Sequence, residues 1–206
     1  MNNLLPDPFL LGEILELSGR LKKNMIISGL LVAFITFFIA LLVSLGSEAL
    51  VRAVNSVLVA FSLLLVIIFL GIFFDIIGTA ATAAELPPFN ARAAKKISGA
   101  KQGVKLIHNA DIVANFCNDV IGDIAGTLSG AIGAGIVMSM SRQLPITDLV
   151  LAGAVMTSLI AALTVGGKAM GKKLAVNEAD RIIFKAAQVV AWLEQVSGWE
   201  IFKNRK

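Results

Sequence analysis

Uncharged apolar segments recur along the 206-residue chain, and each is about as long as the roughly 20 residues that a membrane-spanning helix needs. Only helices satisfy their own backbone groups in lipid at such lengths. The pattern therefore predicts an all-α integral membrane protein with four transmembrane helices. The predicted spans are 25–45, 53–74 with a helical continuation to about 84, 124–141 with an extension back to about 112, and 149–167.

Composition agrees with a membrane protein, because 57% of the residues are hydrophobic and only 16% are charged. Soluble domains average about a quarter charged residues. The apolar run that begins at Met25 is longer than the apolar core of a signal peptide, and no small-residue cleavage pattern follows it. We therefore expect this first span to be retained.

The basic residues predict the orientation of the spans. If the N-terminus lies in the cytoplasm, 16 of the 18 Lys and Arg residues are cytoplasmic, and only Arg52 and Arg142 lie outside. This places both termini in the cytoplasm of a multi-pass protein of the cell (inner or plasma) membrane. The same placement argues against nucleic acid as a partner, because the positive charges flank spans and face the anionic lipids of the bilayer.

Two cytoplasmic segments precede and interrupt the spans. Residues 1–24 carry a rough apolar stripe and are interpreted as a cytoplasmic amphipathic arm. Residues 85–110 are interpreted as a helical insert. Pro87 and Pro88 are expected to stop the second helix. A short helix over 91–96, ending near Ser98 and Gly99, and a weaker one over 101–107 are expected beyond them.

A juxtamembrane amphipathic helix is predicted over 178–200, with Asn177 as its cap. Trp192 and Trp199 suit the level of the lipid headgroups. We expect this helix to lie along the inner membrane surface; a dimer contact is the alternative. Its apolar residues recur at helical spacing: Ile182, Ile183, Ala186, Val189, Val190 and Leu193.

Polar residues at membrane depth are the candidate functional residues, because ionisable groups there are costly and usually face a protein interior or a wet cavity. Carboxylate, amide and hydroxyl oxygens are the ligands that hard cations prefer. The pattern predicts an oxygen-lined ion site; hydrogen bonds between helices, or carboxylates at the interface, are the alternative. The residues are Asp75, Thr79 and Thr82 on the second span, and Asp111, Asn115, Asn118, Asp119 and Asp123 on the third.

Glycines mark two further features. Gly122, Gly126 and Gly130 are spaced four apart, which predicts close helix packing. Gly166, Gly167 and Gly171 weaken the fourth helix. An unwound turn there would offer free carbonyls, including that of Gly167, to an ion site; a flexible exit into the cytoplasm is the alternative.

The sequence does not favour an enzyme. Its one Cys and one His exclude an internal disulfide and argue against a zinc site or a Cys/His catalytic pair. Cys117 is interpreted as a small packing residue and His108 as a solvated loop residue. No nucleophile and base stand together in a catalytic motif.

Four runs, taken in order, resemble the transmembrane domain of the CorB/CorC-like, or cyclin-M (CNNM), magnesium transporters. They are FFDIIGTAATAAE, GAKQGVKLI, VIGDIAG and VGGKAMGKKLAVNEADRI. The resemblance covers about residues 50–200 and implies three spans, a cytoplasmic helical insert and a juxtamembrane helix. The span over 25–45 is then an extra one. The resemblance also implies a homodimer and a dehydrated Mg²⁺ held by short polar side chains and by backbone of the last span.

Carried over by motif, the ion-binding side chains are those of Asp75, Thr79, Asn118 and Asp123, with Asp119 beside them and a carbonyl from Gly167. Na⁺ is the candidate coupling ion. The family's regulatory cystathionine-β-synthase pair has no counterpart before the chain ends, so regulation is expected from a separate protein. The sequence departs from the family pattern at five positions: Asp75 for Ser, Gly78 for Glu, Asp123 for Asn, Lys168 for Glu and Gly171 for Pro.

These departures leave three functional hypotheses. The first is a homodimeric transporter of divalent cations, most simply Mg²⁺. The second is a non-transporting membrane scaffold or partner-binding module, in which the ammonium of Lys168 pairs with the aspartates and takes the place of the cation. The third is a proton- or Na⁺-coupled exporter that uses the same acidic residues.

Overall fold

The computed structural model describes residues 26–27, 29–45, 57–143 and 148–198. By their contacts the residues form two units, Met1–Gly46 and Ser47–Lys206. The first unit contains an apolar helix over Gly29–Leu45, which falls within the first predicted span and is shorter than the other apolar helices. The predicted arm over 1–24 and Trp199 lie outside the described residues.

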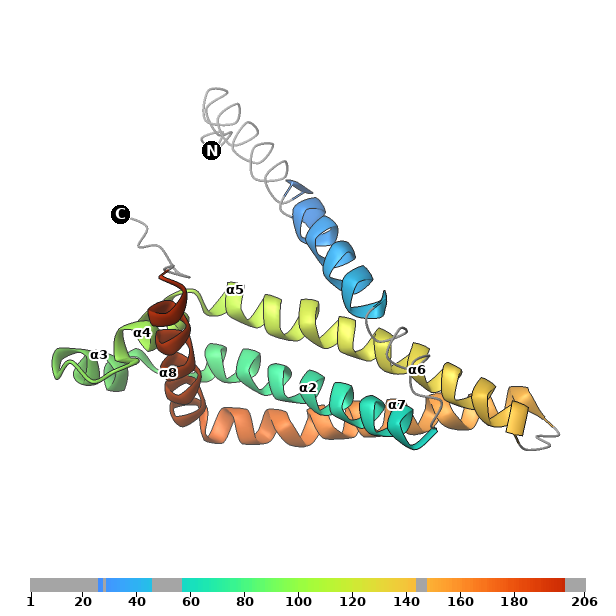
Figure 1. Cartoon of the computed structure of the whole chain (residues 1–206). Coiled ribbons are helices and arrows are strands. Elements are labelled where there is room, and N and C mark those ends of the chain that lie inside the picture. Colours follow the sequence, from blue (N-terminus) through green and yellow to red (C-terminus); the bar gives the residue numbers. More distant parts are fainter. Residues whose placement is uncertain (1–25, 28, 46–56, 144–147, 199–206) are drawn as a thin grey trace, which may run out of the picture. The chain divides into compact units, whose positions relative to one another are not determined.

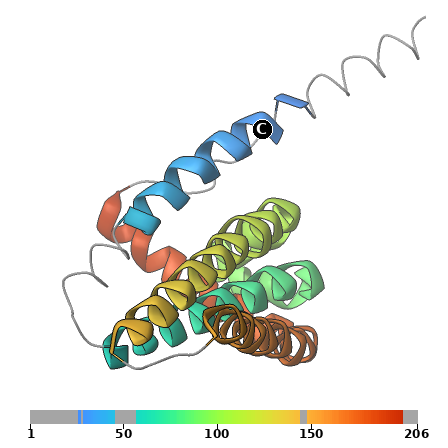
Figure 2. The same cartoon turned by 90° about the vertical axis from the view of Figure 1, so that its right-hand side faces the viewer.

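Three long helices form the body of the second unit, and each is long and apolar enough to cross a membrane. They are α2 (Val57–Ala83), the continuous helix that ends as α6 (Gly122–Gln143), and α7 (Leu149–Asn177). Each packs against the other two, and they lie side by side in both views (Figures 1 and 2). The described residues contain no strand. The all-α prediction is therefore confirmed for the described residues, and three of the four predicted spans correspond to helices long and apolar enough to cross a membrane.

The middle helix of the bundle changes its winding near one end. It begins as α5 (Ala110–Ala114), continues as the π-helix η1 (Asn115–Ile121) and becomes α6. The expected extension back to about residue 112 is confirmed. Short π-helical segments inside α-helices occur frequently at functional sites, because they change which side chains face a neighbour.

Two short helices connect α2 to α5. The predicted end of the second helix near residue 84, before the prolines, is confirmed, whereas the helix expected over 91–96 starts earlier, at Leu86. The helix α2 ends at Ala83, before the prolines, and these stand in the first turn of α3 (Leu86–Ala94). Proline suits that position because the N–H groups of first-turn residues have no hydrogen-bond acceptor within the helix, so the N–H that proline lacks is not needed. The second short helix, α4, covers Ala100–His108 and starts after Gly99, whose positive φ of 83° favours glycine.

The predicted unwound turn near Gly166 is absent, because α7 continues as an α-helix from Leu149 to Asn177. Gly167 and Gly171 instead allow close packing: a Cβ added at either would collide with Ile72, Ile76 or both on α2. The proposed cap was also wrong. Asn177 is the last residue of α7, and α8 (Ala179–Ser197) begins after Glu178 without a side-chain cap.

The helix α8 crosses the end of the bundle and packs on α2 and α4 (Figure 1). Its buried residues are Ala179, Ile183, Ala187 and Ala191, at a strict spacing of four. Of the predicted apolar stripe, Ile183 is buried fully, whereas Val189 and Leu193 are exposed. The apolar residues predicted to form one face of this helix therefore lie on two faces. One face packs against the bundle, and the other is exposed.

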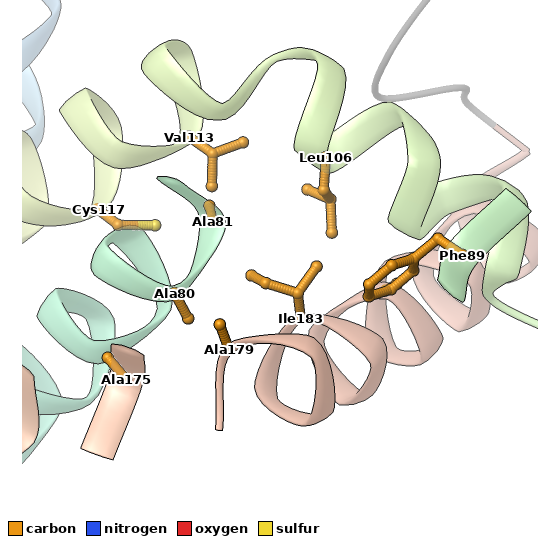
Figure 3. Close-up of a cluster of buried hydrophobic side chains, with 10 residues drawn as sticks. Ala80, Ala81, Phe89, Leu106, Val113, Cys117, Ala175, Ala179 and Ile183 are labelled. Atoms are coloured by element: carbon orange, nitrogen blue, oxygen red, sulfur yellow. The ribbon is translucent and has the colours of Figure 1, made fainter. Parts of the chain in front are cut away.

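Two apolar clusters stabilise the second unit. The cluster at the α8 end, which we name the elbow cluster, joins α2, α3, α4, η1 and the α7–α8 junction around Ile183 (Figure 3). The second, the bundle cluster, lies toward the other end of the three long helices and includes Leu64, Ile68, Leu128 and Ile160.

Candidate functional site

A polar layer separates the two clusters. Along α2, Asp75 stands between Ile68 of the bundle cluster and Ala80 of the elbow cluster. Along α7, Lys168 stands between Ile160 and Ala175 in the same way. Asp75 follows the start of α2 by 18 residues and Lys168 follows the start of α7 by 19, so both lie about 27 Å from those ends. They are therefore at one depth.

An ion pair joins α7 to α2 in this layer. Nζ of Lys168 lies 3.8 Å from Oδ1 of Asp75. The aspartate is buried, with 3% of its surface exposed, whereas the side chain of Lys168 is 23% exposed. A carboxylate buried without a counter-charge is costly, so the lysine offsets part of the penalty of placing Asp75 here.

Small residues give the lysine access to the aspartate. A Cβ built on Gly122 of α6 would lie 3.2 Å from Nζ of Lys168. On α2, a Cβ at Gly71 would lie 2.9 Å from Cβ of Ala125. The helices α2 and α6 therefore approach closely near Gly71, and the small surface of Gly122 leaves room for the ammonium of Lys168. At Gly126 and Gly130, by contrast, no other helix of the described residues lies within 4 Å of the Cβ position.

Asn118 of the π-helix enters the layer from the third helix. Its side chain lies against Gly78, one turn beyond Asp75, and a Cβ at Gly78 would collide with Oδ1 of Asn118. Gly78 is one of the departures from the family pattern, and here it makes room for the amide. The winding of η1 thus brings an amide to the side of α2 that also carries the aspartate.

Three buried oxygen atoms around the layer have no hydrogen-bond partner among the described residues. They are Oδ2 of Asp75, Oδ1 of Asn118 and Oγ1 of Thr164. Thr164 precedes Lys168 by one helical turn on α7. This threonine is not among the residues predicted from the sequence, although its spacing of four from Lys168 was an available signal. Unpartnered buried oxygens are costly and suit a water molecule, a proton or a cation.

Two predicted ion ligands, Asp119 and Asp123, are exposed on the surface of the third helix. Thr79, one turn beyond Asp75 on α2, is half-buried. Oγ1 of Thr82 donates a hydrogen bond to the carbonyl of Thr79 at 2.8 Å, within its own helix. Gly167 lies in a continuous helix against Ile72. The described residues contain no group of three or more His, Cys, Asp or Glu side chains able to hold a metal ion.

Chemically, the layer is a neutral pair of opposite charges with spare oxygen acceptors beside it. A free cation near Asp75 would compete with an ammonium that is already in place. Comparison with protein-family models, with curated proteins and with solved structures gives no match.

Proposed function

We propose that this chain is a partner-binding module of the cell membrane, with four spans and both termini in the cytoplasm, and that it does not transport Mg²⁺. The observation that carries the proposal is the 3.8 Å ion pair between Lys168 and Asp75. The carboxylate that the resemblance assigns to Mg²⁺ already has a cation from its own chain. A divalent ion there would also be repelled by the ammonium.

The outer face of the third helix supports partner binding. Asp119 and Asp123 are exposed within the stretch Ala110–Ser141, which is long and apolar enough to cross a membrane. Thr127 and Ala131 continue this exposed face, and Gly126 and Gly130 leave it open. Carboxylates at such depth call for a neighbour, and small residues allow a second helix to approach. The partner is a membrane helix that presents a cation or amide donors to the two aspartates.

Calorimetric titration of the purified protein with Mg²⁺ tests the first part of the proposal. We expect no saturable binding to the wild type. Lys168→Ala should create or strengthen binding, because it removes the tethered ammonium and leaves Asp75 without a counter-charge. Lys172→Ala, one turn further along α7, is the control and should behave as the wild type does.

Photo-crosslinking in intact cells tests the second part. A photoreactive residue at position 127 should give a defined adduct that Asp119→Leu/Asp123→Leu removes, whereas the same residue at position 159, on an exposed apolar part of α7, should give none. An adduct of doubled mass identifies a second copy of this chain as the partner. Equal adducts from both positions would contradict a dedicated partner face.

Cation transport is the second candidate function, because the three unpartnered oxygens of the polar layer are suitable ligands. Saturable Mg²⁺ binding to the wild type, lost in Asp75→Ala/Asp123→Ala, would favour it over the partner module. Flux that follows a Na⁺ or pH gradient would identify a coupled exporter.

A further inference from the structure

A cavity of about 500 Å³ lies where the α2–α3 connection meets the α7–α8 junction. It is separate from the polar layer, because none of Asp75, Asn118 and Lys168 lines it. We name it the elbow cavity. Its lining residues are Ala83, Glu85, Arg92, Val176, Asn177, Glu178, Ala179, Asp180, Arg181 and Phe184.

Arg92 lines the elbow cavity with a guanidinium that has no carboxylate partner among the described residues. Its guanidinium lies 4.4 Å from the ring centroid of Phe184 and 5.7 Å from that of Phe89, which hold it in place by cation–π contact. Its Nη1 atom is buried and has no hydrogen-bond partner among the described residues. A planar guanidinium held in this way is matched to a phosphate or carboxylate, to which it donates two parallel hydrogen bonds.

The start of α8 adds a second attraction for an anion. The helix has 19 residues and begins without a side-chain cap, and its first three residues, Ala179, Asp180 and Arg181, line the cavity. First-turn N–H groups have no partner within a helix, and the helix dipole makes this end positive. An anion at the elbow cavity is therefore served by both Arg92 and the helix end.

Acidic side chains at the same cavity indicate that the ligand also carries a positive charge. Two of them are already engaged: Oδ1 of Asp180 accepts a hydrogen bond from the backbone N–H of Glu85 at 3.0 Å, and Glu178 pairs with Arg181 at 3.6 Å. The carboxylate of Glu85 forms no ion pair or hydrogen bond with the described residues and is exposed. Arg92 and Glu85 together are complementary to a zwitterion.

The position of the cavity at one end of α7 favours a lipid as the ligand. The 29 residues of α7 extend about 43 Å, which exceeds the roughly 30 Å hydrocarbon layer, so the end at Asn177 lies at headgroup level. Val176 lines the cavity with 57% of its surface exposed and offers an apolar path for an acyl chain. We propose that the elbow cavity binds a phospholipid headgroup with a phosphate diester and a primary ammonium, of the phosphatidylethanolamine type, with the phosphate on Arg92 and the ammonium on Glu85.

Native mass spectrometry of the purified protein with added lipid tests this assignment. Phosphatidylethanolamine should bind at least tenfold more than phosphatidylglycerol, which lacks the ammonium, and more than phosphatidylcholine, whose quaternary ammonium has no N–H donor. Arg92→Gln should reduce phosphatidylethanolamine binding about tenfold. Lys101→Gln, which changes an exposed lysine of α4 away from the cavity, should leave it unchanged.

Glu85→Gln keeps the proposal testable if Arg92→Gln disturbs the fold, because the bond from Glu85 to Asp180 uses the backbone N–H. This variant should lose the preference for phosphatidylethanolamine over phosphatidylglycerol while its melting temperature stays the same. Equal binding of the two lipids by the wild type, or an unchanged preference in Glu85→Gln, would overturn the proposal. Soluble glycerophosphoethanolamine that competes at the same potency as the lipid would overturn the lipid assignment.

Discussion

Lys168 of α7 and Asp75 of α2 form an ion pair of 3.8 Å between the two apolar clusters of the bundle. The pair joins two different helices, whereas the ion pair between Arg181 and Glu178 joins residues three apart in the chain. The Lys168–Asp75 pair occupies the position where the resemblance to magnesium transporters implies a bound cation. Whether this ammonium stays with the aspartate therefore decides between the two functions proposed above.

The energetic coupling of the pair can be measured directly. Asp75→Asn and Lys168→Met should each destabilise the protein, by about 3 kcal/mol for the lysine change, because Lys168→Met leaves a buried carboxylate unpaired. The double variant should be more stable than the sum of the two single effects predicts, since it leaves no charge behind. Unfolding in mixed micelles, followed by circular dichroism, gives the three free energies. Additive losses would show that the two groups do not interact.

Close packing of α2 on α6 predicts opposite effects of two alanine substitutions. Gly71→Ala should destabilise by about 1–3 kcal/mol, because the new methyl group meets Cβ of Ala125, which cannot move without its backbone. Gly126 follows Ala125 on α6, and a Cβ there meets no atom of another described helix within 4 Å. Gly126→Ala should therefore be neutral or stabilising by up to about 1 kcal/mol. Melting temperatures in one detergent compare the two. A larger loss from Gly126→Ala would contradict this packing.

The elbow cluster should depend strongly on Ile183. This side chain of α8 is fully buried against α2 and α4 (Figure 3). Ile183→Ala should therefore lower the free energy of unfolding by about 2–5 kcal/mol. Val196→Ala removes a comparable group from an exposed position on the same helix and should change stability by less than about 0.5 kcal/mol. Protease digestion should cut the Ile183→Ala protein faster near α8. Equal stability of the two variants would mean that α8 is not docked on the bundle.

Apolar periodicity was sufficient to predict the three long helices, because lipid leaves a helix as the only way to satisfy the backbone. Spacing along the second span also singled out Asp75, which the structure buries, and the departure of Lys168 from the family pattern indicated it as a rival to a bound cation. Periodicity could not predict which side of the third helix faces inward. That choice depends on the winding of η1, which directs Asn118 toward α2 and leaves Asp119 and Asp123 exposed.

Glycine and proline were the least reliable signals for the ends of elements. Propensity made Gly167 and Gly171 a weak point of α7, but their contacts with Ile72 and Ile76 keep the helix intact. Tertiary packing outweighs the intrinsic cost of about 1 kcal/mol for glycine in a helix. The helix α2 ends before the prolines, as expected, but the same prolines also stand in the first turn of α3, because proline suits both positions.

The open face of α8 lies either on the membrane surface or against another protein, and the fluorescence of Trp192 can distinguish the two. Val189, Trp192, Leu193 and Val196 form an exposed apolar stripe, and Trp192 is 60% exposed. In a Trp199→Phe variant reconstituted in vesicles, the fluorescence of Trp192 should be quenched by lipids brominated near the headgroup and only weakly by aqueous acrylamide, because the stripe then faces the acyl boundary. A Trp192 that is protected from both quenchers would identify the stripe as a protein contact. Strong quenching by acrylamide alone would place α8 in water, which the exposed apolar stripe does not favour.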